Sequence, residues 1–304
     1  MAQPAKISLL LCLWLHLAWA QQGSQAWYEP APTLQRGRLT GLVASEVALT
    51  GLSYWALHDL WYSQAPRSKF HFFDDNHTWL QIDKVGHGLS AYHIGLFNAT
   101  ALEWSGLSSR KAHLWGGLSG FLYLAGIEVM DGYAAQYGFS RGDIWANFSG
   151  SALLVGQELL WGEQRLMPRF SYQPTPYRQF NPGLLGQNQL QGILKDYNGQ
   201  TYWLSADVAA LTGWQAWPEW LHLAAGYGGT GMLFNRSPNN INAQYPGIVF
   251  QRQFYLAPDL YLPALKPKKP FWRAVFKATR FIKIPAPALS YSQSGGLRGH
   301  WLFF

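Results

Sequence analysis

Polar and charged side chains recur one helical turn apart in three otherwise apolar stretches of the chain. Residues three or four positions apart share one face of a helix, so the members of each pair point the same way. If the three faces turn inward, a single site collects one imidazole, up to four carboxylates and one amide. These candidate site residues are Asp83, His87, Glu128, Asp131, Asp143 and Asn147.

Two chemistries fit such a site. A carboxylate beside a histidine orients the imidazole and raises its basicity, and a second, buried carboxylate with a raised pKa can act as an acid. In that version His87 is the base and Asp83 orients it, with Glu128 and either Asp131 or Asp143 as the acid. Alternatively, one imidazole and several carboxylate oxygens suit a hard or borderline divalent metal ion. The residues do not choose between these chemistries, so the sequence names no reaction, cofactor or metal.

A purely structural role for the same side chains is the competing interpretation. Asp83 and Asp143 lie where they could cap helices, and Lys84 is expected to be an interfacial or surface charge. His93 lies off the face that Asp83 and His87 share. Five other histidines lack matching partners at helical spacing and are expected to be structural or exposed. They are His58, His71, His77, His113 and His222.

Four apolar stretches must supply the helices that position these residues. Each is about long enough to span a membrane, roughly 20 residues, but polar groups interrupt each one, and the sequence does not decide between membrane spans and a buried bundle. Ser140 with Asp143 three residues later is typical of a capping box, and four glycines in the third stretch favour close helix packing. We expect a compact bundle of hydrophobic, Gly-rich helices over residues 39–164. Its stretches are roughly Leu39–Trp61, Val85–Trp104, Ala112–Met130 and Ile144–Trp161.

Residues 165–304 are expected to form a loop-rich C-terminal region. Four prolines and little apolar periodicity in Met167–Gln200 favour a long surface connection. Short helices would then end in a glycine turn at Gly226–Met232, before an extended segment over residues 248–262. Apolar residues at helical spacing over 271–282, opposite basic ones, predict a final amphipathic helix. The expected fold class is therefore mainly α.

Composition and the first residues indicate an exported chain. Charged residues make up only 13% of the 304 residues and aromatic residues 16%, a balance typical of membranes or apolar interfaces. A basic residue, an apolar run and an A-x-A site predict a signal peptide over residues 1–20, followed by a leader over 21–38. The single cysteine, Cys12, lies in that apolar run, so the mature chain would carry no thiol chemistry.

The positive charge points to a surface rather than to nucleic acid. The net charge is +7, and the excess is concentrated at Lys266–Lys283, which favours a membrane or lipid surface, with a solvated helix face as the alternative. No nucleic-acid-binding signature occurs, so nucleic acid is not an expected partner. A small amphiphile in a cavity lined by tryptophan is the other expected partner.

The order of the polar residues resembles two families. DKVGHGLSAYH, which begins at Asp83, is followed by a Gly-rich helix ending EVMDGYAAQYGFSRGDIWANFSG. Together they resemble the YfiM-like family of bacterial envelope proteins of unknown function, described as predicted periplasmic lipoproteins. The order Asp-Lys-x-x-His, then Glu, then Asp-x-x-x-Asn-x-x-Gly is more loosely similar to VanZ-like membrane domains. The match to the first family runs from about Phe73 to Gly156.

The resemblance implies a cell-envelope protein built from hydrophobic helices, and it supplies no activity. The chain departs from the lipoprotein description, because Cys12 follows three leucines and lacks the small residue that acylation needs. We therefore expect an exported, membrane-associated protein of the periplasm or cell envelope whose polar cluster binds or acts on a lipid or other amphiphile. The alternative is a non-catalytic scaffold in which the same residues form hydrogen-bond networks that fix helix register.

Overall fold

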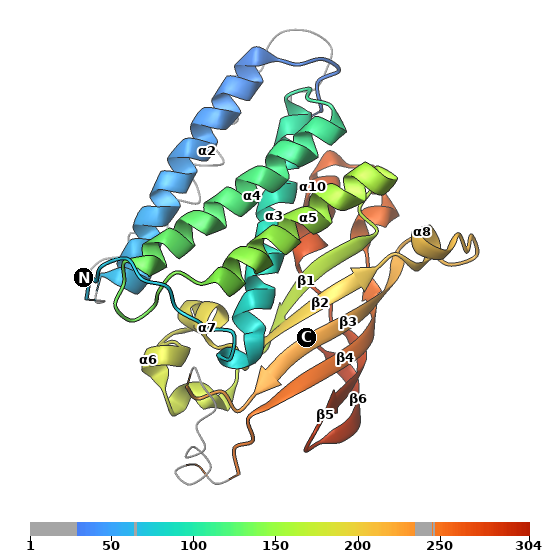
Figure 1. Ribbon diagram of the computed structural model, residues 1–304. Coiled ribbons are helices and arrows are strands. Elements are labelled where there is room, and N and C mark those ends of the chain that lie inside the picture. Colours follow the sequence, from blue (N-terminus) through green and yellow to red (C-terminus); the bar gives the residue numbers. More distant parts are fainter. Residues whose placement is uncertain (1–28, 64–65, 235–244, 246) are drawn as a thin grey trace.

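The computed structural model describes residues 29–63, 66–234, 245 and 247–304. The predicted signal peptide and its cleavage site lie outside the described residues. Helices fill the first half of the chain and an antiparallel sheet the second, and Figure 1 shows the two halves lying against each other.

All four apolar stretches form helices. The central one, α3, packs along both α4 and α5, and it also contacts strands β1, β2 and β3 of the sheet as well as α2 and η2. The outermost, α2, keeps its side chains half-buried or exposed. The helices are α2 (Arg36–Leu57), α3 (Ile82–Trp104), α4 (Ser109–Gly132) and α5 (Arg141–Trp161), with single turns η1 (His58–Tyr62) and η2 (Trp79–Gln81) between the first two. Within the described part of the chain, no helix combines the length and apolar character needed to cross a membrane.

Glycines allow α3 to touch its neighbours backbone to backbone. A Cβ atom at Gly116 or Gly120 of α4 would collide with carbonyl oxygens of α3, and one at Gly150 of α5 would collide with the carbonyl oxygen of Gly88. Backbone atoms cannot rotate away from such a clash as a side chain can. The close approach predicted for the Gly-rich stretch is therefore present, and it sets the spacing of the helices that carry the polar residues.

Replacing Gly150 with alanine is expected to lower the free energy of unfolding by about 1 to 3 kcal/mol, because the added methyl group overpacks the contact between α3 and α5. The matched control is Gly156→Ala on the same helix, where an added Cβ meets nothing within 4 Å. That change is expected to stabilise the protein by roughly 0.5 to 1 kcal/mol through helix propensity. Urea unfolding of both variants measures the difference. Equal shifts in the same direction would contradict the close packing.

The expectation of a mainly α fold is wrong. The C-terminal half forms one six-stranded antiparallel sheet in which each strand pairs with its neighbour in sequence, so that the chain ends in a β-hairpin. The strands are β1 (Leu166–Tyr172), β2 (Gln200–Ala206), β3 (Leu221–Thr230), β4 (Gln251–Leu260), β5 (Ala286–Ser292) and β6 (Gly296–Phe303). The protein is therefore a mixed α and β structure.

Proline and glycine residues within the strands are the reason that the sequence did not predict them. Pro168 lies in β1, an edge strand, where a missing N–H is tolerated. Gly226 was expected in a turn but lies inside β3, opposite Trp203 of β2, whose ring covers the space a side chain would occupy. The expected surface connection contains β1 and three short helices, η3 (Pro176–Gln179), α6 (Pro182–Leu185) and α7 (Gln189–Lys195).

The expected amphipathic helix is short and does not end the chain. It forms α10 (Pro270–Ala278), which continues as the single turn η5 (Thr279–Phe281) before β5. Two other short helices, α8 (Val208–Thr212) and η4 (Leu262–Leu265), lie in the connections after β2 and β4. The segment expected to be extended before α10 contains β4, which is an inner strand of the sheet.

Apolar contacts join the two halves at the start of α3. Leu80, Ile82 and Leu89 pack with Tyr202 of β2 and with Met232 in one buried cluster. This cluster anchors the first turns of α3 on the sheet. Those turns carry Asp83 and His87.

Candidate functional site

Three helices bring four of the six predicted site residues into two touching groups, and a fifth, Asn147, contacts the first of them through His87. Donor atoms of His87, Glu128 and Asp143 lie within 4.8 Å of one another, and so do those of Asp75, Asp83 and Asp143. We call the first group the His87 cluster. The second group, together with Lys84, is the Lys84 cluster. Asp143, in the first turn of α5, belongs to both.

The imidazole of His87 is held in one orientation by Asn147. His87 Nδ1 lies 3.0 Å from Asn147 Oδ1, and since an amide oxygen only accepts, Nδ1 carries the proton. In the neutral ring the lone pair of Nε2 is then free, and Nε2 lies 3.7 Å from Glu128 Oε1. The group that orients His87 is therefore Asn147 and not Asp83, the residue expected to do so.

Glu128 is a buried carboxyl group with one unused oxygen. The backbone N–H of Ser140 donates to Oε2 at 3.1 Å, whereas Oε1 is buried and has no hydrogen-bond partner among the described residues. The Glu128 side chain is only 1% exposed, while that of His87 is 23% exposed. Burial, reinforced by Asp143 and Asp131, raises the pKa of Glu128 to about 9. His87 is thus the more exposed of the two side chains and forms the solvent side of the pair. Among the described residues, no lysine or arginine forms an ion pair with Glu128.

Lys84 is not the interfacial or surface charge that was expected. Its Nζ donates to Asp75 Oδ1 at 2.7 Å and to Asp143 Oδ1 at 3.0 Å, and lies 3.6 Å from Asp83 Oδ2. Burial alone would lower the pKa of Lys84, but Asp83 and Asp143 together with the hydrogen bonds raise it to about 12. One ammonium group therefore serves three carboxylates.

The three carboxylates differ in how well they are compensated. Burial opposes ionisation of Asp75, but hydrogen bonds with Asp143, Lys84 and Ser140 hold its pKa below the usual value. Burial raises the pKa of Asp143, and the neighbouring Asp75 adds to that effect. Burial and the charge of Asp143 raise the pKa of Asp83 to about 7. The Lys84 cluster thus holds more carboxylate groups than cations, since Lys84 faces three of them.

Asp131 lies outside both clusters. Its Oδ1 accepts a hydrogen bond from the Tyr62 hydroxyl at 2.6 Å, and burial raises its pKa to about 7. Asp131 therefore acts on the site only through its charge, which raises the pKa of Glu128.

Sequence reasoning missed Asp75 and Tyr62. Asp75 lies before η2 and outside any helix, so a search for shared helix faces could not find it. The predicted cap at Ser140 is confirmed: its Oγ accepts from the backbone N–H of Asp143 at 3.0 Å and donates to Asp75 at 2.6 Å. The adjacent pair of aspartates at 74 and 75, followed by a lysine on a helix, was the available signal.

Two histidines expected to lack partners have carboxylates beside them. His113 Nδ1 lies 3.7 Å from both Glu103 and Glu158. His222 is buried and lies 3.2 Å from Ser205 Oγ, which itself donates to Asp259 at 2.6 Å. Because that hydroxyl proton is committed to a buried aspartate rather than to the histidine, the arrangement does not activate a nucleophile.

A further buried ion pair lies beside this histidine. Arg169 Nε is 3.0 Å from Asp259 Oδ2, with both side chains fully buried, and Arg169 also donates to the backbone oxygens of Leu260 and Ile282. Lys283 Nζ lies 3.6 Å from Asp259 Oδ1. These contacts tie the segment after α10 to the sheet, which is a structural role.

Within the His87 cluster, His87 and Glu128 are spaced as two ligands of one divalent ion would be. Two ligands that each lie about 2.1 Å from an ion can be up to about 4.2 Å apart, so the 3.7 Å between His87 Nε2 and Glu128 Oε1 fits one shared ion. Asn147 would be the outer partner that fixes the ring, as metal-binding histidines commonly require. The same orientation equally presents Nε2 as a general base.

Comparison with known proteins matches part of the chain. Residues 71–156 match the family model described as "Predicted periplasmic lipoprotein (DUF2279)". Curated proteins and solved structures gave no match. The matched residues include α3, α4 and most of α5, and therefore all six predicted site residues. The description of the matched family model mentions neither the YfiM-like family nor VanZ-like domains. In its helical half the chain is thus similar to a family described as predicted periplasmic lipoproteins, of unknown function, and this supports export to the periplasm or cell envelope.

Proposed function

We propose that this exported envelope protein binds a divalent transition-metal ion between His87, Glu128 and Asp143. The observation that carries the proposal is the buried Glu128 Oε1, which has no hydrogen-bond partner among the described residues and lies 3.7 Å from the free lone pair of His87 Nε2. A buried, unpaired carboxylate oxygen is costly. A cation between these two atoms satisfies both.

The donor set indicates the class of ion. One imidazole and two carboxylates suit first-row divalent ions such as Mn²⁺, Fe²⁺ or Zn²⁺. Asp143 Oδ1 accepts from Lys84 and the side chain also hydrogen-bonds with Asp75, so an ion would share Asp143 with these two partners. Three protein ligands leave at least one coordination position for water or a substrate oxygen, and a bound divalent ion lowers the pKa of such a water. Since His87 is partly exposed, that position would face the route from solvent.

The Lys84 cluster is a weaker place for an ion. The ammonium group of Lys84 already contacts all three of its carboxylates at 2.7 to 3.6 Å. A second cation there would meet the charge of Lys84. We therefore assign the ion to the His87 cluster alone.

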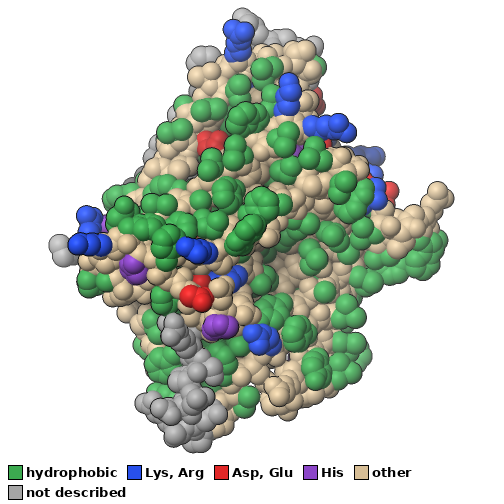
Figure 2. Space-filling view, viewed as in Figure 1, with side chains coloured by type: hydrophobic (Ala, Val, Ile, Leu, Met, Phe, Trp, Pro, Cys, Tyr) green, Lys and Arg blue, Asp and Glu red, His purple; other side chains and the backbone are tan. Residues whose placement is uncertain are grey.

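We further propose that the ligand or substrate is a lipid or other amphiphile and that the protein is membrane-associated. Large apolar side chains are exposed along the helices, and Figure 2 shows hydrophobic side chains spread over α4 and α5. Contiguous exposed apolar surface marks contact with a membrane or a partner. Examples on α2 and α5 are Val47, Trp55, Trp145 and Leu160, each at least two-thirds exposed.

A scaffold role is the second candidate, and the Lys84 cluster favours it. Lys84 joins the segment before α3 to α5 through two hydrogen bonds, which fixes the register of these elements without any chemistry. The scaffold and the metal site differ in what they require of His87. A scaffold needs only the hydrogen bond to Asn147, whereas a metal site needs Nε2.

Metal titration of chelator-treated protein tests the proposal. We expect the wild-type chain to bind one Zn²⁺ or Mn²⁺ ion in calorimetry and His87→Gln to lose that binding, because glutamine supplies no imidazole lone pair. The matched control is His77→Gln, which replaces an exposed histidine outside both clusters and is expected to bind as wild type does. Circular dichroism checks that both variants fold. A folded His87→Gln protein with unchanged metal affinity would exclude the site.

A further inference from the structure

A cavity of about 1070 Å³ lies between α10 and the connections after β2 and β4. The residues that line it are separate from the His87 and Lys84 clusters. Its charged lining residues are the cations Lys266, Lys268, Arg273, Lys277 and Arg280 and the carboxylates Glu163, Asp207 and Glu219. Cations therefore outnumber carboxylates around the cavity.

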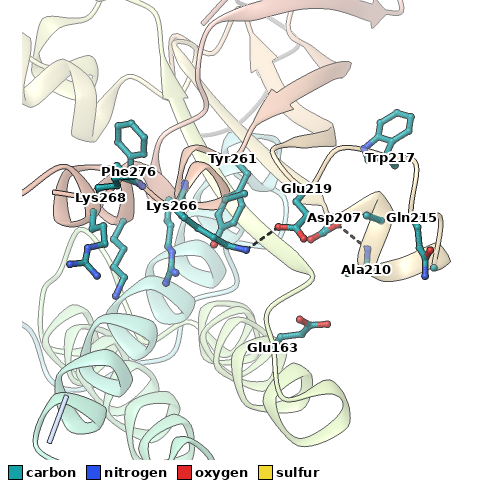
Figure 3. Close-up of a pocket in the computed structure, with 18 residues that line it drawn as sticks. Glu163, Asp207, Ala210, Gln215, Trp217, Glu219, Tyr261, Lys266, Lys268 and Phe276 are labelled. Carbon is teal, nitrogen blue, oxygen red and sulfur yellow. Dashed lines mark hydrogen bonds and ion pairs between the residues drawn. The ribbon is translucent and has the colours of Figure 1, made fainter. Parts of the chain in front are cut away.

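The two kinds of charge occupy different sides. Figure 3 shows Lys268 on the side of α10 and Glu163 and Asp207 on the opposite side, with Lys266 directed at Glu219. That pair is 3.3 Å long, and both side chains are more than two-thirds exposed, so it contributes little. Among the described residues no ion pair involves Lys268 or the three basic residues of α10 and η5. The α10 side of the cavity is thus an uncompensated positive surface.

Positive charge also accumulates beneath that side. The Nε atom of Arg280 is buried and has no hydrogen-bond partner among the described residues. Burial lowers the pKa of His93 to about 4, and the charges of Arg169 and Arg280 add to the effect. The nearby Asp259 is already shared by Arg169 and Lys283. An anion in the cavity would supply the charge that this region lacks.

The helix that carries the cations also presents apolar side chains to solvent. Phe271 and Trp272 are 68% and 47% exposed and pack against each other with ring centroids 5.3 Å apart. Phe276 of the same helix lines the cavity beside the cations. A short basic helix with exposed aromatic residues is typical of a segment that lies in the interface of a membrane.

From the cavity, its surplus of unpaired cations and the exposed aromatic pair, we infer that the cavity receives the phosphate-bearing headgroup of an anionic phospholipid while α10 lies on the bilayer surface. Lysine and arginine are the usual partners of phosphate oxygens, and the aromatic pair would enter the interface next to the headgroup. This inference is independent of the metal site, since the two share no residues.

Vesicle co-sedimentation of the mature chain tests the inference. We expect the protein to bind vesicles of phosphatidylcholine mixed with phosphatidylglycerol and to bind vesicles of phosphatidylcholine alone much more weakly. The double variant Arg273→Glu/Lys277→Glu is expected to bind the anionic vesicles at least about tenfold more weakly. The matched control, Arg110→Glu/Lys111→Glu, makes the same change in net charge at two exposed residues of α4 and is expected to bind like the wild type. All four changed positions are exposed, so folding should persist, and circular dichroism checks it.

Three results would overturn the inference. Equal loss of binding in the control would show that net charge alone drives the association. Unchanged binding of the double variant would show that the cavity takes no part in the association with vesicles. Thermal stabilisation of the wild type by inorganic phosphate, without any binding to anionic vesicles, would assign the cavity to free phosphate instead of to a lipid.

Discussion

Replacing Glu128 with glutamine is expected to abolish metal binding and also to stabilise the metal-free protein at neutral pH. Glutamine keeps an oxygen that can accept from the backbone N–H of Ser140, as Glu128 Oε2 does, but it offers no anionic ligand. In the metal-free wild type, the pKa of Glu128 rises from its ordinary value of 4.5 to about 9, first because of burial. At pH 7 that difference corresponds to about 3 kcal/mol of lost stability, which the variant does not suffer.

The raised pKa of Glu128 determines whether the protein gains or loses stability as pH rises. The folded pKa of Glu128 lies above the unfolded value, so folded protein binds the extra proton and stability falls as pH rises between about 4.5 and about 9. In chelator, the stability of Glu128→Gln should fall less steeply over this range. Urea unfolding at several pH values measures both slopes, and calorimetry measures the metal affinity. Glu163→Gln, at a carboxylate that is 55% exposed, is the control and should leave both quantities nearly unchanged. A Glu128→Gln variant that binds metal normally would contradict the assignment.

Replacing Lys84 with methionine is expected to lower the free energy of unfolding by about 3 to 5 kcal/mol at pH 7. Methionine keeps the length of the side chain but removes the only cation that contacts Asp75, Asp83 and Asp143 within 3.6 Å among the described residues. Removing one partner of a largely buried ion pair leaves uncompensated charge, which costs far more than an exposed pair contributes.

Lowering the pH should recover part of this loss. Burial and the charge of Asp143 already raise the pKa of Asp83 to about 7, and protonated carboxyl groups no longer repel one another. The matched control is Lys266→Met, whose ion pair with Glu219 is exposed and should contribute about 0 to 1 kcal/mol. Thermal or urea unfolding of both variants separates the cases. Equal losses of unfolding free energy in the two variants would show that Lys84 contributes no more to stability than an exposed lysine does.

Helical spacing was enough to find most of the candidate site because its side chains lie on helices. The pairs Asp83 with His87 and Asp143 with Asn147 share faces as their spacing predicts. Two of these residues, His87 and Asp143, meet Glu128, and Asn147 holds the ring of His87. Spacing says nothing about contacts made by other elements. Lys84 was therefore misplaced, since its direction depends on Asp75 in the preceding segment and on Asp143 of α5.

The sheet could not be read from the sequence because its strands violate local rules. Gly226 and Gly228 in β3 have no side chains to show alternation, and the ring of Trp203 on the neighbouring strand covers the first of them. Pro258 lies within β4, beyond the part that pairs with β5. Tertiary contacts stabilise the strands despite these residues and so override local propensity. The basic helix was found because its own periodicity is strong.

The most direct test of the metal site is anomalous X-ray diffraction from crystals of the mature chain soaked in Mn²⁺ or Zn²⁺. We expect one strong anomalous peak within bonding distance of His87 Nε2, Glu128 Oε1 and a carboxylate oxygen of Asp143, with Asn147 still hydrogen-bonded to His87 Nδ1. Density that lacks a peak at this position, with Glu128 Oε1 bonded instead to an ordered water or to a protein donor, would contradict the proposed function.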